Sequence, residues 1–373
     1  MSAFSRIRFS PFLAAFALFL PVTAVAQPRQ DCTPAFSAVD DWQGADAAYS
    51  IPLKDGRVVW IFGDTLYGDK RVVTNNIPRM VHNSIGISHC DAGKWNLTYI
   101  IRKNPDGSPS EFFHPQHPKT WFWALDGFTT GKELWVTLLC IRNVPKPTSW
   151  AFDFATCGTD LARVTHLDDD PQKWQVSYFP LVPDGTGAYP SAASLVYGKD
   201  AYIFALYESG SRPNLLTRIP LNGLKNPQGS LTYLGTDNLW HPGFNPATAK
   251  AVMQHGTSEL SVRYHPELHR WLSVLMNPAG LSNQVLLRTA PELTGPWTEG
   301  EVIYRIPEMD PSNPLYDKDT FCYAAKEHSE FESHGELLFT YVCNTTATPK
   351  LETEKNIYFP QVVRIAMPPV ASK

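Results

Sequence analysis

The stretch from Trp42 to Leu66 reads WQGADAAYSIPLKDGRVVWIFGDTL and predicts a β-hairpin with one aspartate on each strand near the open end. Two runs of aliphatic and aromatic residues flank Lys54-Asp55-Gly56, and a three-residue loop with glycine in the left-handed region is a common hairpin connection. A two-residue Asp55-Gly56 turn is the alternative, and it shifts the ladder by one residue. The turn therefore decides which side chains of the hairpin share a face.

The three-residue turn brings the two aspartates together. It places Leu53 opposite Arg57, and counting outward along the ladder places Asp46 opposite Asp64. Residues directly opposite each other point to the same face, with Cβ atoms about 4.5 to 5.5 Å apart. With the two-residue turn, the two carboxylates would point to opposite faces. We predict the facing pair, an arrangement that suggests a hydrolase with two carboxyl groups.

The hairpin pattern recurs along the chain as a strand, a tight polar turn and a second strand rich in aromatic and aliphatic residues. The turns fall near positions 55, 131, 198, 268 and 334, so consecutive turns are 66 to 76 residues apart. Each hairpin is followed by further strand-like sequence, and no amphipathic helix of useful length interrupts the series. Five such units predict an all-β fold, a five-bladed β-propeller with four strands per blade.

The last unit lacks one strand, so we predict that the segment after Cys32 completes it and closes the ring. A β-sandwich or a β-helix is the alternative architecture. No low-complexity tract or linker divides the sequence, and residues 27–373 are therefore predicted to form a single propeller domain.

Residues 1–26 have the pattern of a secretory signal peptide, with two arginines, an apolar run from Phe12 to Leu20 and Ala24-Val25-Ala26 before the cleavage site. The apolar run is too short to span a bilayer. Without those two arginines, 30 basic and 36 acidic residues remain, which argues against a nucleic-acid or anionic-membrane partner. We expect a secreted or periplasmic monomer without membrane insertion.

All six cysteines follow the predicted signal peptide, and an even number in an exported chain indicates disulfides. The sequence contains no Cys-x-x-Cys pair, the spacing that would suggest a zinc site. The predicted bonds are Cys32–Cys90, Cys140–Cys157 and Cys322–Cys343.

The predicted inner strands bring acidic, aromatic and amide side chains to one end of the central axis, a combination that suits a sugar. Asp46 and Asp64 are the candidate catalytic residues, because glycoside hydrolysis needs one protonated and one ionised carboxyl within a sugar's width. The alternative is structural, with Asp64 capping the turn after Gly63 and Asp46 bound to backbone. The candidate substrate-binding residues are His82, Asn83, Tyr189, Glu208, His255, Glu259 and Tyr323.

No metal ion or other cofactor is predicted. His114 and His117 have a metal-like spacing, but the prolines around them exclude the helix that would place both rings on one side. Asp168-Asp169-Asp170 is predicted to be a solvated acidic turn, with calcium binding as the alternative. The sequence contains no nucleophile elbow and no phosphate-binding loop.

The pair of segments GADAAYS, Gly44–Ser50, and WIFGDT, Trp60–Thr65, resembles glycoside hydrolase family 183, the endo-D-arabinanases. These are exported propeller proteins once grouped as a domain of unknown function. The likeness spans most of the chain after the signal peptide. Further similar segments are Glu259–Leu272, Pro291–Trp297 and Tyr323–Cys343.

The resemblance implies a five-bladed propeller, a D-arabinofuranose polymer as substrate and Asp46 with Asp64 as the catalytic pair. The leading hypothesis is therefore an exported glycoside hydrolase that cleaves furanosidic linkages, an endo-acting D-arabinanase whose partner is a polysaccharide or oligosaccharide. The assignment of acid and base, and the choice between retention and inversion, stay open at this point. The alternatives are a non-catalytic carbohydrate-binding propeller and a glycosidase for another glycan, such as an L-arabinan.

Overall fold

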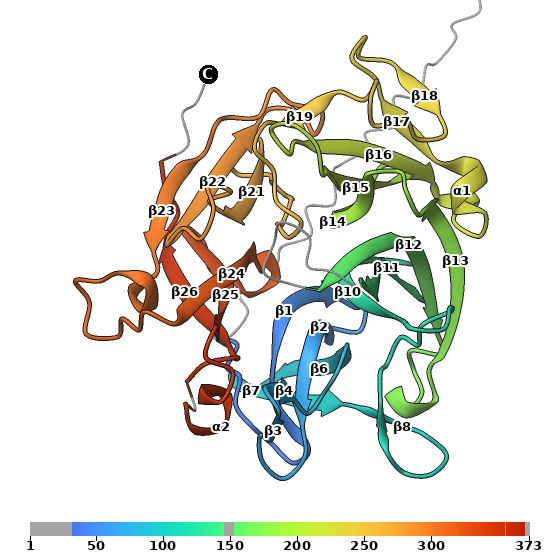
Figure 1. Ribbon diagram of the computed structural model, residues 1–373. Helices are drawn as coiled ribbons and strands as arrows, with labels where there is room; N and C mark the ends of the chain where they lie inside the picture. Colours follow the sequence, from blue (N-terminus) through green and yellow to red (C-terminus); the bar gives the residue numbers. More distant parts are fainter. Residues whose placement is uncertain (1–31, 145–152, 355, 370–373) are drawn as a thin grey trace, which may run out of the picture.

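The computed structural model describes residues 32–144, 153–354 and 356–369, and its main strands form five sheets around a central axis (Figure 1). The predicted all-β fold, a five-bladed β-propeller, is confirmed. The predicted signal peptide lies outside the described residues. Within those residues, no helix is long and apolar enough to cross a bilayer.

The first three blades each run from an innermost strand outward (Figure 1). Blade one consists of β1 (Trp42–Pro52), β2 (Val58–Tyr67), β6 (Ser84–Asp91) and β7 (Lys94–Ile100), with β5 (Met80–Val81) paired to β2. Blade two consists of β10 (Thr120–Thr130), β11 (Glu133–Asn143), β12 (Phe154–Thr165) and β13 (Gln175–Pro183). Blade three consists of β14 (Ala188–Tyr197), β15 (Asp200–Tyr207), β16 (Asn214–Pro220), β17 (Thr232–Leu234) and β18 (Trp240–Pro242), with β19 (Ala251–Met253) paired to β16.

The last two blades are smaller. Blade four consists of β20 (Arg263–His265), β21 (Arg270–Met276), β22 (Gln284–Ala290) and β23 (Glu301–Arg305), and blade five of β24 (Thr320–Glu327), β25 (Glu336–Thr345) and β26 (Pro360–Ala366). Two short ribbons pair β3 (Val73–Thr74) with β4 (Ile77–Pro78) and β8 (Arg102–Lys103) with β9 (Pro109–Ser110). The helical turns are α1 (Pro227–Ser230), α2 (Lys350–Thr353), η1 (Pro171–Lys173), η2 (Leu221–Gly223), η3 (Pro307–Met309) and η4 (Ser329–Phe331).

The first hairpin has the predicted three-residue turn, because the backbone N–H of Leu53 donates to the carbonyl of Arg57 at 2.8 Å. The predicted register holds along the closed end of the ladder. Farther out, two irregularities flank Ala47, which pairs with Phe62, before the ladder resumes. Asp46 therefore leaves the backbone within a bulged stretch and not from a regular rung.

Similar irregularities interrupt the innermost strands β1, β10, β14 and β24. In β1, Ala47 and Ala48 have φ angles of 65° and 60°, and in β24 Ala324 has a φ of 60°. Non-glycine residues rarely adopt this left-handed conformation, and bulges commonly re-aim side chains next to functional sites. The bulges thus turn inner-strand side chains toward the axis. The alanines at the bulges have small side chains, which leave room for the strands close to the axis.

The predicted closing strand after Cys32 is wrong, because the last blade has three strands in the described residues. The segment instead lies on blade one. Phe36 packs edge-on against Trp60 with a centroid distance of 5.0 Å, and the Trp95 indole N–H donates to the carbonyl of Ala35 at 3.0 Å. The disulfide Cys32–Cys90 ties the segment to blade one, and its contact with β26 is a side-chain hydrogen bond from Arg364 to the Thr33 hydroxyl at 3.3 Å.

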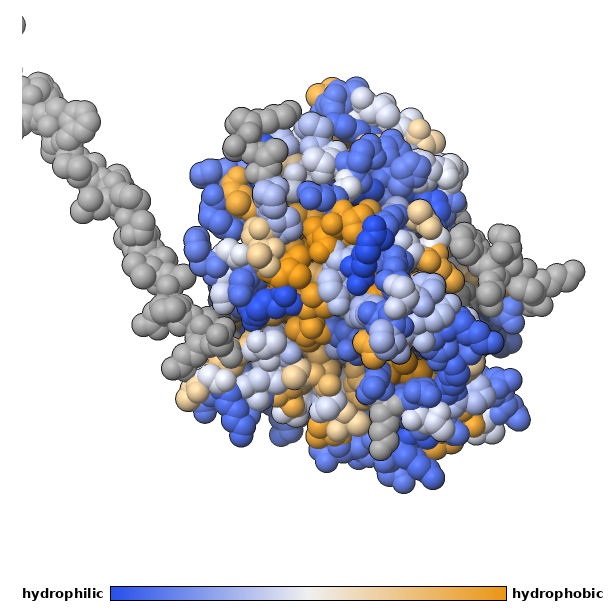
Figure 2. Space-filling model, turned by 90° about the vertical axis from the view of Figure 1, so that its left-hand side faces the viewer, coloured by the Kyte–Doolittle hydropathy of each residue, from blue (hydrophilic) through white to orange (hydrophobic). Residues whose placement is uncertain are grey.

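The outer strand β26 consequently pairs only with β25 among the described strands. Most of its side chains are half-buried on both faces. Figure 2 shows a band of hydrophobic surface on the side of the molecule that carries the last two blades.

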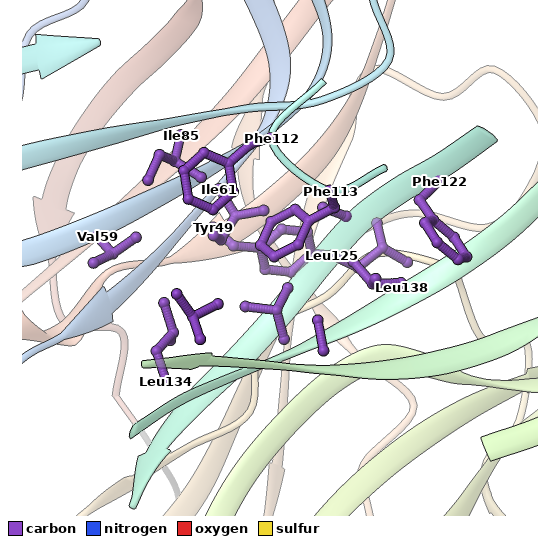
Figure 3. Packing of buried hydrophobic residues seen from close by; sticks show 14 of the residues in the cluster. Tyr49, Val59, Ile61, Ile85, Phe112, Phe113, Phe122, Leu125, Leu134 and Leu138 are labelled. Atoms are coloured by element: carbon purple, nitrogen blue, oxygen red, sulfur yellow. The ribbon is translucent and has the colours of Figure 1, made fainter. Parts of the chain in front are cut away.

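The hydrophobic core is divided into clusters that fill the spaces between neighbouring blades. In the cluster between the first two blades, Val59 and Ile61 of β2 face Leu134 and Leu138 of β11, with Phe113 between the sheets (Figure 3). These side chains are at most 1% exposed. Close packing of this kind fixes the relative position of the blades, and therefore of the groups at the axis.

All three predicted disulfides are confirmed: Cys32–Cys90, Cys140–Cys157 and Cys322–Cys343. The last joins directly opposite residues of β24 and β25, the strands that carry part of the axial site.

We expect the double variant Cys322→Ser/Cys343→Ser to lose about 3 kcal/mol of unfolding free energy, the loop-closure value for a separation of 21 residues. Equilibrium unfolding in denaturant measures the change. The control is Thr320→Ser/Thr345→Ser, which alters another cross-strand pair of the same ladder without removing a bond. Equal losses in the two double variants would contradict a contribution from the crosslink.

Candidate active site

The bulge in β1 places the Asp46 carboxylate directly above Gly63 of β2. A Cβ added at Gly63 would overlap Asp46 Oδ1 and lie 3.4 Å from its Cγ, so the carboxylate occupies the space of the missing side chain. Its other oxygen, Oδ2, accepts hydrogen bonds from the Tyr323 hydroxyl at 2.7 Å and the Tyr358 hydroxyl at 3.3 Å. Asp46, a residue of the first blade, is therefore held by two hydroxyl groups of the last blade.

Burial raises the pKa of Asp46 well above its ordinary value, and the negative charges of Asp64 and Glu259 raise it further. The hydrogen bond from Tyr323 and the charge of Lys326 act in the opposite direction but are the smaller effects. The pKa of Tyr323 is itself raised by burial and by Asp46, so the phenol keeps its proton and remains a donor. This environment favours the protonated form of Asp46.

Asp64 has a different environment on the neighbouring strand. The Nδ1 of His82 lies 2.9 Å from Asp64 Oδ1, and the Trp123 indole N–H donates to the same oxygen at 3.1 Å. His82 in turn stacks on Trp121 with a centroid distance of 4.6 Å. The imidazole and the indole thus fix the direction of the Asp64 carboxylate through one of its oxygens.

A third carboxylate, Glu259, comes from the segment before β20. Its Oε1 lies 3.7 Å from the ammonium of Lys326, which is 1% exposed. Lys326 also donates to the carbonyls of Ala47 at 2.6 Å and Ala324 at 2.7 Å. The lysine thus joins the bulge of β1 to the bulge of β24 and provides a partner for Glu259. Burial raises the pKa of Glu259, while Lys326 lowers it.

These groups surround a cavity of about 110 Å³ at the axis. The volume is smaller than the roughly 300–1,000 Å³ typical of sites that enclose a drug-sized ligand, so the cavity suits one small unit of a longer ligand. Its lining combines acidic and aromatic groups with an apolar floor. The lining residues are Asp46, Ala47, Gly63, Trp123, Ala124, Leu125, Leu139, Ser258, Glu259 and Tyr323.

A second, larger hollow of about 640 Å³ lies beside Tyr358, between blades five and one. Phe359 and Arg71 are in contact on its wall, with the guanidinium 4.7 Å from the ring centroid. Gln43 and Gln361 add amide groups. Two of its lining residues, Gln43 and Phe359, are sequence neighbours of Gly44 and Tyr358.

Five of the predicted site residues lie together at the axis. Asp46, Glu259 and Tyr323 line the cavity, and Asp64 with His82 forms the adjoining hydrogen-bonded pair.

The other four predicted residues are placed elsewhere. Asn83 is fully buried, and its side chain bonds the backbone of Phe113 and Phe122, so it holds the segment and does not face the cavity. Tyr189 is 6% exposed and belongs to the hydrophobic cluster between blades one and two. Glu208 and His255 are exposed and do not line the axial cavity.

Three residues of the site were not predicted from the sequence: Trp123, Lys326 and Tyr358. Trp123 lies on an inner strand close to a bulge, as Asp46 does. Its position on a predicted inner strand could therefore have identified it. Lys326 follows the bulge of β24 and would have been expected on the surface. Tyr358 comes from the loop before β26, where the sequence carries no periodic pattern.

The fold and the site define a class, a five-bladed propeller with three carboxyl groups around an axial cavity. The chain belongs to the family described as domain of unknown function DUF5005, whose family model matches residues 30–366. No curated protein matches the sequence.

Two solved structures are similar to this chain. A candidate hydrolase from Bacteroides ovatus ATCC 8483 is 16% identical with a TM-score of 0.66, covering 87% of this chain and 86% of that chain. An exo-1,5-alpha-L-arabinanase from a bovine ruminal metagenomic library is 11% identical with a TM-score of 0.43, covering 87% of this chain and 94% of that chain. The first similarity shows a common fold, and neither bears on the activity of this protein.

Proposed function

We propose that the protein is an exported glycoside hydrolase, secreted or periplasmic, that cleaves furanosidic linkages as an endo-acting D-arabinanase. The observation that carries the proposal is the contrast between two neighbouring carboxylates. Asp46 is buried among negative charges that raise its pKa, whereas Asp64 has the His82 imidazole and the Trp123 indole N–H on one oxygen. Hydrolysis of a glycosidic bond requires one carboxyl group as the acid and a second as the base or nucleophile.

In the proposed mechanism, Asp46 is the general acid. Its raised pKa keeps a proton on the carboxyl group, which then donates it to the departing glycosidic oxygen. Asp64 is the ionised partner that takes a proton from water or attacks the anomeric carbon. His82 and Trp123 orient Asp64 through Oδ1, which leaves Oδ2 for the reacting group.

The remaining groups fit a sugar. Glu259 lines the cavity next to a buried lysine and can accept hydrogen bonds from hydroxyl groups, while Trp123 and Tyr323 provide aromatic walls. The small axial cavity suits a single furanose ring, and we place further units of a polymer in the larger hollow lined by Phe359 and Arg71. D-arabinan as the substrate rests on the resemblance of the two aspartate segments to the family 183 enzymes.

The test is incubation of the full chain with a D-arabinan, such as arabinogalactan, and in parallel with an L-arabinan. New reducing ends and a ladder of oligosaccharides from the D-arabinan support the proposal. Products from the L-arabinan alone would assign another glycan. Saturable binding without any new reducing ends would overturn hydrolysis in favour of a carbohydrate-binding propeller.

The pH profile tests the assignment of Asp46 as the acid. Loss of its proton at high pH should produce the basic limb of kcat/KM. The Tyr323 hydroxyl stabilises the ionised carboxylate and so lowers the pKa of Asp46. Tyr323→Phe removes that effect, so the pKa rises and the basic limb moves to higher pH.

Tyr358→Phe is the matched control, because its contact with Asp46 is longer at 3.3 Å and a smaller displacement is expected. Kinetic pH profiles of the three proteins measure the result. A basic limb that moves to lower pH in Tyr323→Phe would refute the role of Asp46 as the acid.

A further inference from the structure

A second cluster of chemically active side chains lies at the opposite ends of the inner strands. His265 ends β20 and Glu327 ends β24, while Glu332 follows the turn η4. Each offers one ligand atom, and these atoms lie within 4.8 Å of one another. Tyr323 pairs with Val342 and Glu327 with Phe339, three residues apart along β25, which is about 10 Å at a rise of about 3.3 Å per residue. The cluster is therefore separate from the proposed catalytic site.

The cluster is largely buried, and hydrogen bonds fix its side chains. His265 is 4% exposed, and Glu327 is 1% exposed. His265 Nε2 lies 2.6 Å from Glu327 Oε1, and its Nδ1 lies 3.0 Å from Glu267 Oε1. Glu332 accepts the backbone N–H of Leu338 at 2.9 Å. Each of the three side chains thus has a fixed direction before any ligand binds.

Glu327 supplies the independent observation. Its second oxygen, Oε2, is buried and has no hydrogen-bond partner among the described residues. An unpaired buried carboxylate oxygen is costly, and native structures rarely leave one without a reason. Arg263 interacts electrostatically with Glu327, but this arginine also serves Asp126, 3.7 Å away, and Glu330. Glu327 therefore shares this arginine with two other acids.

We propose that His265, Glu327 and Glu332 bind one divalent transition-metal ion of the zinc type. One imidazole nitrogen and two carboxylate oxygens form a ligand set that zinc accepts, with water completing the coordination. Calcium prefers six to eight oxygen ligands, so the imidazole disfavours it. The ion replaces the proton between His265 Nε2 and Glu327 Oε1, and Oε2 gains the partner that it lacks.

Glu267 positions the ligand. Its hydrogen bond with His265 Nδ1 keeps the proton on that nitrogen and leaves Nε2 for the metal, as carboxylate groups behind metal-binding histidines do in general. The bound ion would join the inner strand of blade four to the inner strand of blade five, whose ligands are 62 residues apart in the chain. Its role is thus a crosslink between blades.

The experiment uses the full chain, freed of metal with a chelator and then dialysed. Zn²⁺, Mn²⁺ and Ca²⁺ are added separately, and metal content after gel filtration, calorimetric affinity and Tm are measured. One equivalent of zinc and a Tm that rises with its concentration are expected, with no response to calcium. Addition of Co²⁺ should give visible d–d absorption bands that report direct coordination. Zinc content well below one equivalent would overturn the proposal.

Variants locate the ion. Glu332→Gln and His265→Asn should abolish the Tm response and the cobalt bands, and Glu267→Gln should weaken zinc binding about 10- to 100-fold. If His265→Asn does not fold, the half-buried Glu332 still provides the test. His241→Asn is the matched control, because His241 forms an exposed pair with Asp237 at 2.9 Å. Loss of zinc in the control with retention in Glu332→Gln would refute the site.

Discussion

Asp64→Asn is expected to lower kcat about 10²- to 10⁴-fold on the cleaved arabinan, the usual contribution of a positioned acid or base. Asparagine keeps an oxygen that accepts the N–H groups of His82 and Trp123, so the fold should survive. The variant lacks the carboxylate group that takes a proton from water or attacks the anomeric carbon. Steady-state kinetics together with the unfolding midpoint measure the effect.

Asp46→Asn should lose activity to a similar extent but gain stability at neutral pH. The folded-state pKa of Asp46 is raised, so the wild type loses stability as the pH rises from the unfolded-state value through the folded-state value. Asparagine carries no charge to bury and avoids that loss. A variant of either aspartate that retains most of its activity would remove that residue from the catalytic pair.

Asp126→Asn is the control for Asp64→Asn, because it removes a different carboxylate near the axis that has no proposed catalytic role. Asp126 is fully buried and accepts the backbone N–H groups of Gly127 at 2.9 Å and Ser194 at 2.7 Å, one on each oxygen. An asparagine amide can accept only one of them, so this variant should lose stability. Its activity per folded molecule should change far less than that of Asp64→Asn.

Gly63→Ala should lower kcat about 100-fold while changing stability by less than about 1 kcal/mol. The added methyl group would take the place of Asp46 Oδ1, and a catalytic group displaced by about 1 Å loses activity on this scale. The stability cost is small because the displaced atom ends a side chain and is not backbone. Gly63 needs no left-handed backbone, so alanine introduces no φ strain there. Kinetics and thermal unfolding of the purified variant measure the two effects.

Gly56→Ala gives the opposite pattern. Gly56 has a φ of 89° in the hairpin turn, and no atom lies within 4 Å of an added Cβ. Alanine there should cost about 1 kcal/mol of backbone strain and leave kcat unchanged. Full activity in Gly63→Ala would show that the carboxylate of Asp46 can move without consequence, which would contradict its catalytic role.

The sequence allowed prediction of features that depend on local pattern. The turn at Lys54-Asp55-Gly56 determined the register of the closed end of the first hairpin, and recurrent turns gave the five blades. An even number of cysteines in an exported chain indicated disulfides, and the three predicted pairs are the observed ones. Tyr323 and Glu259 were found because the sequence pattern placed them at the start of predicted inner strands, although β24 begins at Thr320 and β20 at Arg263.

Other features depend on long-range packing and left no local signal. The bulge at Ala47 moves Asp46 over Gly63, a displacement that hydrophobic alternation does not encode. Asn83 has an amide side chain of the kind that binds sugars, but here the amide forms hydrogen bonds with buried backbone groups. The cluster of His265 and Glu327 joins positions 62 residues apart, so no metal-binding spacing appears in the sequence.

The ring is closed without a covalent bond between its ends. Each disulfide stays within one blade, and the first and last blades share no ladder among the described strands. They meet through side chains, including Tyr323 with Asp46, His328 with Ser50 at 2.6 Å, and Lys326 with the backbone of blade one. The acid of the proposed reaction is thus a component of the seam. If the contacts between the first and the last blade were lost while every sheet stayed folded, Asp46 would lose its position and the protein its activity. The catalytic rate therefore reports on closure of the ring as well as on the chemical step.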